Sequence, residues 1–444
     1  MTRIAVIGGG IAGLTCARAL IGAGFDAHVL EAGLRPGGVI ASTRIGGYLR
    51  EHAASSFLGG PPHGALALCK ELGVATVKAS PRARRRWIYL DGKLRALPGD
   101  PIALARSDLL TWRGKLALLR EPFAPRRAGG DESVHAFAAR RLGPEAARAI
   151  VAPFVTGVFA ADAREVSLDA GFPRLAALDA AGGLVRGGLA RAAARLAARL
   201  RGGGERTTPR GMYAPAGGVG SLTDALHAAL GDRVRCGARV RAIAADRGAL
   251  RIDGERWDGA VLALPAADAA ALVGGELAAT LAGFQRAPVA IVYLGFAEAA
   301  MPRARDGFGF LVGQGEDVRV LGVVFESTVW PDRAPPGHAL LRCIFGGGRD
   351  PEAFKLADAE LIELARRDVG VVLGADAAPS HASVVRSPRG IAQYGLGHRD
   401  RVRAAVELAR PLRLALAGAD YRGTGVNDLC ADAAEVAREV AAWG

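Results

Sequence analysis

The chain has 444 residues with 57 Lys and Arg against 44 Asp and Glu, which makes its formal net charge +13. This length allows two or three domains with a substantial core, and no apolar run reaches the 18 residues that would suggest a transmembrane helix. Five scattered cysteines, eight scattered histidines and no Gly-x-Ser-x-Gly motif argue against disulfides, zinc and serine hydrolysis, and they favour a cytoplasmic location.

The N-terminal residues predict a dinucleotide-binding unit. An apolar strand at 3–7 is followed by a glycine-rich turn, a helix over 11–23 and a second strand that ends at Glu31. The glycines of the Gly-x-Gly-x-x-Gly pattern are Gly8, Gly10 and Gly13. They allow a tight turn, a close approach to a pyrophosphate and close helix–strand packing. Glu31 would accept hydrogen bonds from ribose hydroxyls, which argues against a 2′-phosphate.

A basic amphipathic helix follows further along the chain. Between 182 and 212 seven arginines accompany a single acidic residue, Glu205. The apolar positions that recur at helical spacing are Val185, Leu189, Leu196 and Leu200. The helix either packs these side chains on the protein's own core or lies on an anionic membrane surface. Nucleic acid is not an expected partner, because no aromatic platform accompanies the arginines.

The remaining chain predicts more pieces of the nucleotide-binding domain. Residues 212–244 indicate a glycine turn, a helix and a strand, and "WDGAVLALPA" indicates a buried strand that Pro265 ends. Residues 414–440 predict a buried strand, a loop and an amphipathic helix. The loop holds three glycines in the eight residues 418–425, which suits a close approach to a bound group.

In the segment after Glu31, Arg35 precedes a second glycine pair, Gly37 and Gly38. This segment resembles the flavoprotein amine-oxidase superfamily, in which the stretch wraps the FAD diphosphate while a C-terminal glycine loop closes over the flavin. Longer stretches resemble the oxygen-dependent protoporphyrinogen oxidases. They are residues 86–101, 132–175, 307–337, 344–352 and 392–402 and the closing "AGADYRGTGVND". The resemblance covers nearly the whole chain in order.

This resemblance implies an α/β fold like that of p-hydroxybenzoate hydroxylase. It has a doubly wound, Rossmann-type FAD domain, a mixed-sheet substrate domain and a helical insertion. We expect the FAD domain at 1–75, 212–275 and 385–444 and the substrate domain at 76–100 and 276–384. The helical domain, at 101–211, contains the basic helix and is the candidate membrane-associating part.

The implied activity is oxidation of protoporphyrinogen IX to protoporphyrin IX in haem biosynthesis. Three rounds of hydride transfer to FAD remove six electrons, and O2 reoxidises the flavin to give H2O2. FAD is expected to bind non-covalently, since no Cys or His is clearly placed for a covalent link. Two alternatives stay open: a coproporphyrinogen III oxidase, and a flavin-binding homologue without catalysis. Besides porphyrinogen and O2, the candidate partners are the inner face of the cell membrane, haem-pathway enzymes and a second copy of the chain.

The resemblance also assigns site residues. Arg86 would pair with a substrate propionate, Gly157 would lie close to the porphyrinogen ring, Leu311 would make an apolar ring contact, and Trp330 stands where the family usually has Phe. No catalytic side chain or metal is expected. The assigned FAD contacts are Gly8, Gly9, Gly10, Ile11, Ala12, Gly13, Glu31, Ala32, Arg35, Gly38, Val39, Ser55, Ser56, Val240, Gly418, Gly423, Thr424, Gly425 and Val426.

Three departures from the family pattern lie at cofactor positions. Val39 follows the second glycine pair where a bulky or basic residue is usual. Ala53 and Ala54 stand where Gly-Pro is common, and Arg399 stands where a tryptophan is common beside the flavin.

Overall fold

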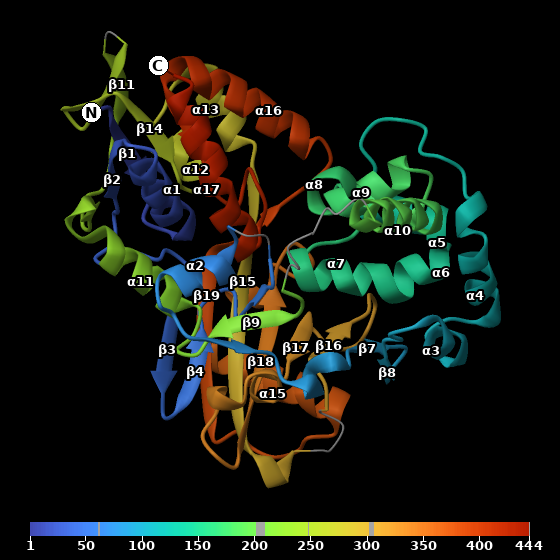
Figure 1. Ribbon diagram of the computed structural model, residues 1–444. Helices are drawn as coiled ribbons and strands as arrows, with labels where there is room; N and C mark the ends of the chain where they lie inside the picture. Colours follow the sequence, from blue (N-terminus) through green and yellow to red (C-terminus); the bar gives the residue numbers. More distant parts are fainter. Residues whose placement is uncertain (61–62, 201–208, 247, 302–305, 444) are drawn as a thin grey trace.

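The computed structural model of the protein describes residues 1–443 except 61–62, 201–208, 247 and 302–305. Figure 1 shows a parallel sheet with both chain termini at one end, a long mixed sheet at the other end, and a group of helices beside them. The predicted α/β class, with one parallel and one mixed sheet, is confirmed.

The parallel sheet has five strands in the order β10-β2-β1-β14-β20. The strands are β1 (Arg3–Ile7), β2 (Asp26–Leu30), β10 (Val234–Arg235), β14 (Gly259–Leu262) and β20 (Leu414–Leu416). The chain passes from β1 to β2 on one side and adds β14 and β20 on the other. The order therefore reverses beside β1, and the carboxyl ends of strands at such a point are where doubly wound proteins bind nucleotides.

Alternate residues of β1 enter two different cores, so that helices cover both faces of the parallel sheet. Ile4 and Val6 pack with α1 (Ile11–Gly22), α2 (Ala65–Glu71), α11 (Gly220–Leu230) and α17 (Val426–Ala441). Ala5 and Ile7 pack with α12 (Ala266–Ala270), α13 (Gly275–Ala282), α16 (His398–Ala409) and the small sheet of β11 (Ile243–Asp246), β12 (Ala249–Ile252) and β13 (Glu255–Trp257). Coverage of both faces explains why the central strands are almost continuously apolar.

The mixed sheet has seven strands in the order β19-β15-β18-β17-β16-β7-β8. They are β7 (Trp87–Leu90), β8 (Lys93–Ala96), β15 (Gln285–Ala297), β16 (Gly309–Val312), β17 (Gly322–Val324), β18 (His338–Gly346) and β19 (His381–Gln393). Among these seven strands, β16 and β7 pair in parallel and all other neighbours pair antiparallel. The helix α15 (Asp358–Leu373) covers one face and shares a core with Leu341, Cys343 and Phe345 of β18. The alternate residues of β18 therefore face the rest of the molecule.

Two further sheets join segments that are distant in sequence. One pairs β3 (Ser42–Ile45) with β4 (Tyr48–Glu51), and the other has the order β5 (Phe57–Leu58), β9 (Met212–Pro215), β6 (Thr76–Lys78). The domain boundaries expected after 275 and before 385 fall inside α13 and β19. Since α13 packs on the parallel sheet, the expected positions do not coincide with the ends of elements, and the boundaries stay predictions.

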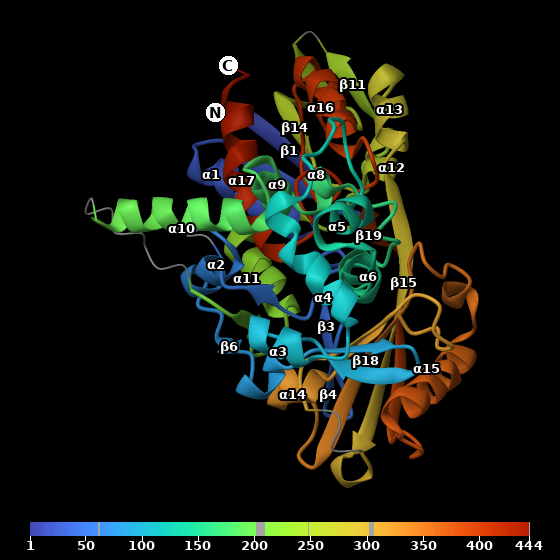
Figure 2. The ribbon, with the colours of Figure 1, turned by 90° about the vertical axis from the view of Figure 1, so that its right-hand side faces the viewer.

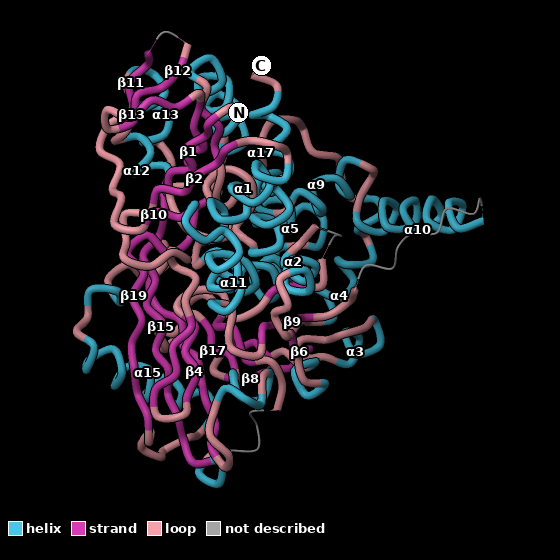
Figure 3. Tube along the Cα trace, turned by 60° about the vertical axis from the view of Figure 1, so that its left-hand side comes forward, coloured by secondary structure: helices cyan, strands magenta, loops and turns pink. Residues whose placement is uncertain are grey.

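Residues 101–200 supply the helical part, and the predicted basic helix is α10. The helices are α3 (Pro101–Arg106), α4 (Trp112–Leu119), α5 (Val134–Leu142), α6 (Pro144–Ala146), α7 (Ala152–Phe159), α8 (Leu168–Gly171), α9 (Pro173–Ala180) and α10 (Leu184–Leu200). Figures 2 and 3 show α10 extending outward from the other helices. In the described part of the chain, no helix combines the length and apolarity that crossing a bilayer requires.

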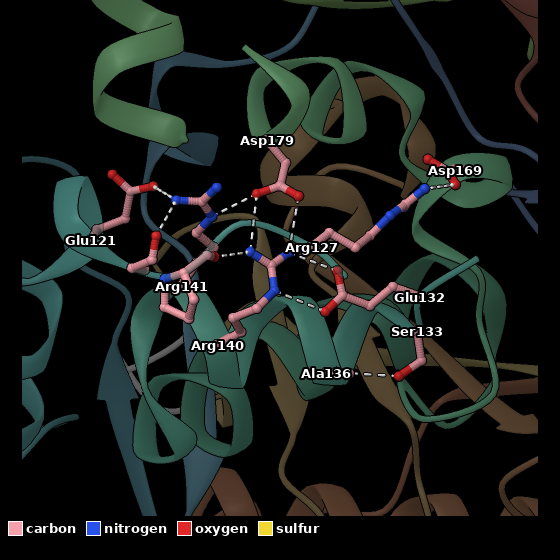
Figure 4. A network of polar contacts seen from close by, with 11 residues as sticks. Glu121, Arg127, Glu132, Ser133, Ala136, Arg140, Arg141, Asp169 and Asp179 are labelled. Carbon is pink, nitrogen blue, oxygen red and sulfur yellow. Dashed lines mark hydrogen bonds and ion pairs between the residues drawn. The ribbon is translucent and has the colours of Figure 1, made fainter. Parts of the chain in front are cut away.

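Buried ion pairs hold the start of α10 against its neighbours (Figure 4). Arg140 Nη2 and Arg141 Nε lie 2.9 and 2.5 Å from the carboxylate of Asp179 on α9. Burial alone would raise the pKa of Asp179, but hydrogen bonds from the two arginines outweigh it and lower that pKa. The Glu121 carboxylate accepts the first two backbone N–H groups of α10 at 2.6 and 3.1 Å, which stabilises the helix start.

Candidate active site

The turn between β1 and α1 has the geometry of an anion site. Gly8 has a φ of +106°, and a Cβ there would lie 2.6 Å from the carbonyl oxygen of Ala263. A Cβ on Gly13 would lie 1.9 Å from the carbonyl oxygen of Gly8, so only glycine lets α1 pack this closely. A Cβ on Gly10 would meet no heavy atom of the described residues within 4 Å, and α1 starts there without a side-chain cap. The helix therefore presents backbone N–H groups and its positive end to open space.

The second glycine pair lies directly against this turn. The Gly37 N–H donates to the carbonyl oxygen of Gly9 at 2.7 Å, and a Cβ on Gly38 would lie 3.2 Å from the Cα of Gly10. The structure thus brings together the two segments that the family resemblance assigns to the FAD diphosphate. Val39 is 50% exposed and Arg35 is also exposed.

Glu31 follows β2 and reaches the same turn. Its carboxylate accepts the N–H groups of Gly9 and Gly33, both at 2.6 Å. Its position beside the glycine turn fits the expected ribose contact. Ala32, which follows Glu31, is exposed.

Val240 does not lie on a strand, although the pattern over 212–244 predicted one in this region; its contact with FAD stays a prediction. The strand β10 ends at Arg235, and Val240 lies in the irregular segment before β11. The segment still runs beside the predicted ribose site, because the Ala238 N–H donates to the carbonyl oxygen of Glu31 at 2.9 Å. The sequence pattern indicated a longer strand because the apolar residues continue after the turn at 236–237.

We expect Glu31→Gln to weaken FAD binding by about 1–3 kcal/mol, because a charge-assisted acceptor for ribose is lost. Titration of the FAD-free protein with FAD measures this loss. The substitution also disturbs the bonds to Gly9 and Gly33. Thermal unfolding of the FAD-free variant therefore serves as the control, and an unchanged dissociation constant would contradict the assigned role.

The C-terminal glycine loop follows β20, at the same sheet edge as the turn after β1. The Tyr394 hydroxyl donates to the carbonyl oxygen of Ala419 at 2.6 Å and accepts the Gly423 N–H at 3.0 Å. Asp420 is 1% exposed and accepts a hydrogen bond from Arg286 Nε at 2.9 Å. These three side chains fix the loop that the sequence analysis assigned to FAD. Of the assigned residues, Gly418 and the first residue of α17, Val426, are buried, and Gly423, Thr424 and Gly425 are half-buried.

The sequence analysis missed Tyr394, Asp420 and Arg286. The first two stand inside stretches that resemble the family, but nothing in the sequence around Arg286 signals its contact with a loop far along the chain.

Tyr394 also stacks on His398, with ring centroids 4.1 Å apart. Burial, aided by the charge of Arg401, lowers the pKa of His398 to about 4, so this imidazole is neutral at pH 7. Arg399, the departure expected beside the flavin, is exposed on α16.

A cavity of about 350 Å³ opens next to this loop. Tyr394 and Arg286, which hold the loop, both line it. The other lining residues are Ala161, Glu165, Val166, Gln285, Ala287, Gly348, Gln393 and Gly395. None of the predicted substrate residues is among them.

Glu51 joins several segments beneath the site, and the sequence analysis gave it no such role. It is 0% exposed, and its carboxylate accepts hydrogen bonds from Arg333 Nη1, the Val219 N–H and the Ser42 hydroxyl. Its backbone exchanges two hydrogen bonds with the Tyr293 hydroxyl, at 2.9 and 2.8 Å. Glu51 therefore ties β4 to α11, β15 and the segment after α14 (Glu326–Val329).

The loop after Glu51 is held from the mixed sheet. Arg342 of β18 donates to the carbonyl oxygen of Ala53 and to Ser55 Oγ, the latter at 3.3 Å. Ser55 is buried, while Ala54 and Ser56 are half-buried. The expected FAD contacts of Ser55 and Ser56 stay predictions.

Two of the predicted substrate residues touch, and a third comes just before the strand that pairs with one of them. A Cβ on Gly157 of α7 would lie 2.5 Å from Leu311 Cδ2 of β16, so these two residues touch. Arg86 precedes β7, which pairs with β16, and its guanidinium carbon lies 5.5 Å from the centre of the Phe308 ring. The structure therefore places an apolar side chain against a close-packed glycine where α7 meets the mixed sheet, with Arg86 at the start of the adjacent strand β7.

Trp330 lies in a different environment. It is 1% exposed and packs in a cluster with Ala83, Ala214 and Val329, against which Phe308 also packs. The indole is thus part of the core that supports the Arg86 region. Its contact with substrate stays a prediction.

The glycine turn, the adjacent glycine pair and the unblocked start of α1 fit a flavin dinucleotide. The described residues contain no group of His, Cys, Asp and Glu that could hold a metal ion.

Comparison with known proteins agrees with this geometry. A family model described as flavin-containing amine oxidoreductase matches residues 11–441. Bovine protoporphyrinogen oxidase is 31% identical and aligns over 98% of this chain and 98% of its own length. Coproporphyrinogen III oxidase of Staphylococcus aureus is 28% identical over 100% of both chains. A candidate protoporphyrinogen oxidase from Exiguobacterium sp. 255-15 shares the fold, with a TM-score of 0.83 and 23% identity over 99% of this chain and 98% of that one. The chain therefore belongs to the flavin-containing amine oxidoreductases and, within them, to the protoporphyrinogen oxidase family.

Proposed function

We propose that the protein oxidises protoporphyrinogen IX to protoporphyrin IX, with non-covalently bound FAD and with O2 as the electron acceptor. When bound, FAD supplies the hydride acceptor and the reaction with O2 that yields H2O2. The residues of the chain hold the dinucleotide at the glycine turn and orient the macrocycle. Four of the five cysteines are buried, which suits thiols kept reduced in a cytoplasm.

The observation that carries the substrate proposal is that the Arg86 side chain is exposed and, within the described part of the chain, unpaired, unlike those of its neighbours. Its neighbours Arg82 and Arg85 both pair with Asp306, at 3.4 and 3.6 Å. Arg86 is exposed and forms no ion pair among the described residues. An unpaired guanidinium at the start of β7, the strand next to Leu311 in the mixed sheet, suits a carboxylate on the rim of an apolar ring.

Anaerobic mixing of the FAD-loaded protein with each porphyrinogen tests this function. We expect protoporphyrinogen IX to bleach the flavin absorbance by delivering two electrons, with coproporphyrinogen III reacting more slowly. Admission of O2 should then reoxidise the flavin, allow the remaining four electrons to be removed and yield protoporphyrin IX. Preference for coproporphyrinogen III would favour the alternative substrate, for which the full-length match to the S. aureus enzyme is the supporting observation. If neither porphyrinogen reduces the bound flavin, the protein is a flavin-binding homologue without catalysis.

We also propose that the helical part contacts the inner face of the cell membrane. Large apolar side chains are exposed there, and we call them the apolar helical surface: Ile102 (66%), Trp112 (66%), Leu116 (47%), Leu119 (72%), Phe123 (80%), Val185 (46%) and Leu189 (67%). Exposure of Val185 and Leu189 argues against the alternative in which α10 packs them on the core. The side chains of Arg191, Arg195, Leu196, Arg199 and Leu200 lie outside the described residues. Apolar side chains beside many arginines suit an anionic lipid surface.

We expect the protein to sediment with anionic vesicles and to dissociate at high salt. Changing Arg191, Arg195 and Arg199 to Gln should weaken binding by about 1 kcal/mol per charge. Phe123→Ser should weaken it further, because an apolar side chain is removed from lipid. The matched control is Val371→Ser, since Val371 is 50% exposed on α15, outside the helical part. Equal binding of all variants to neutral and anionic vesicles would contradict the proposal and leave haem-pathway enzymes or a second copy as occupants of this surface.

A further inference from the structure

Arg342 lies on the face of the mixed sheet that meets the predicted flavin site. In β18, Leu341 and Cys343 face the core under α15, so Arg342 faces the opposite way. Its strand neighbour in β17 is Val324, and the next facing pair along the same strands is Gly322 with Ile344. Gly322 in turn pairs with Leu311, the predicted ring contact.

The contacts of Arg342 join the two halves of the site. Its side chain reaches from the mixed sheet to the loop after β4, where Nη2 donates to the carbonyl oxygen of Ala53 and Nη1 donates to Ser55 Oγ. Arg342 is only 8% exposed. Two hydrogen bonds from one planar guanidinium restrict both the position and the orientation of this loop.

The surroundings leave much of this positive charge uncompensated. The nearby Arg333 is paired with Glu51, whereas no carboxylate among the described residues forms an ion pair with Arg342. Glu326 is 0% exposed, and its two carboxylate oxygens accept no hydrogen bond from the described residues. Burial raises the pKa of Glu326, although the charges of Arg342 and Arg333 oppose this. Protonation of Glu326 would leave the Arg342 charge unopposed.

We propose that Arg342 is a positioning residue for the flavin, which fixes the loop at 53–55 and places a buried positive charge beside the cofactor. The inference rests on the flavin site proposed above. A reduced flavin carries more negative charge than an oxidised one at neutral pH, so a nearby buried cation stabilises the reduced form. The same two hydrogen bonds hold the loop in the conformation that receives FAD. Arg342 therefore affects both the affinity for FAD and its reduction potential.

Two substitutions separate these effects. Arg342→Met removes the charge and both hydrogen bonds at similar volume, while Arg342→Lys keeps the charge but loses the two-pronged contact. We expect Arg342→Met to lower the midpoint potential of the bound flavin and to raise the dissociation constant of FAD by roughly 10- to 100-fold. Arg342→Lys should also bind FAD more weakly but should keep a potential close to that of the wild type. Dye-equilibrated reduction and FAD titration measure the two quantities.

Arg386 provides the matched control. It lies on β19 of the same sheet and donates to the backbone oxygens of Phe354 and Leu356 and to Asp358, away from the predicted cofactor segments. Arg386→Met should lower the unfolding temperature and leave the flavin potential and FAD affinity unchanged. If Arg342→Met behaves in the same way, its role is structural only and the proposal is overturned.

A second pair of variants keeps the test decisive if Arg342→Met fails to fold. Ser55→Ala removes one acceptor of Arg342 and should weaken FAD binding several-fold. Arg342→Gln keeps a hydrogen-bond donor but removes the charge, and it should lower the flavin potential. Wild-type potential and affinity in both variants would overturn the proposal. A wild-type protein that takes up no FAD would instead refute the function proposed above.

Discussion

Glu51→Ala is expected to destabilise the protein by about 3–5 kcal/mol, because it removes one partner of a buried ion pair. Both side chains of the pair are almost fully enclosed, with exposed fractions of 1% for Glu51 and 0% for Arg333. The variant would leave the Arg333 cation buried, and its Nε and Nη2 already have no hydrogen-bond partner among the described residues. The Val219 N–H and the Ser42 hydroxyl would lose their acceptor as well.

Urea denaturation of the wild type and the variant, both without FAD, measures this loss. The control is Glu352→Ala, because Glu352 and its partner Lys355 are each 68% exposed. That exposed pair should contribute less than about 1 kcal/mol. Replacing Glu51 and Arg333 together, with Gln and Met, should recover part of the stability, since no unpaired charge would then be buried. A Glu51→Ala midpoint equal to that of the control would show that the buried pair contributes nothing.

Arg86→Ala is expected to raise the KM for protoporphyrinogen IX by roughly 10- to 150-fold, which corresponds to about 1.5–3 kcal/mol for a charge-assisted pair. A propionate lies at the rim of the macrocycle, away from the bridging carbon that is oxidised. Its ion pair should be nearly as strong in the ground state as in the transition state, and uniform binding of this kind changes KM more than the rate at saturation. Arg86→Lys should restore only part of the loss, because a point charge lacks the planar match to a carboxylate.

Steady-state kinetics and single-turnover reduction of the flavin distinguish the two effects. Arg82 is the matched control, since it lies on the same segment, is 61% exposed and pairs with Asp306. Arg82→Ala should leave KM unchanged. An Arg86→Ala enzyme with a normal KM would show that Arg86 is only one more surface arginine, and the unpaired state of its guanidinium would need another explanation.

The sequence by itself determined the elements whose causes are local. Apolar periodicity predicts the strand and helix within 3–22 and the helix at 426–441. The glycine turn is predicted because no other residue type fits its backbone. The family resemblance then identified the class of protein from motifs in their order along the chain. The strand predicted within 212–244 ends early, at Arg235, because apolar periodicity does not show where a strand loses its pairing partner.

Only the tertiary structure decided how distant segments meet. Glu51 and Arg333 are separated by 282 residues, and Arg342 and Ser55 by 287, so no local pattern could have paired them. The same holds for Tyr394, whose hydroxyl holds the C-terminal loop, and for the exposure of Leu189 on α10. A buried polar group needs a partner, but the sequence does not say which one, since that depends on the packing of whole elements against each other.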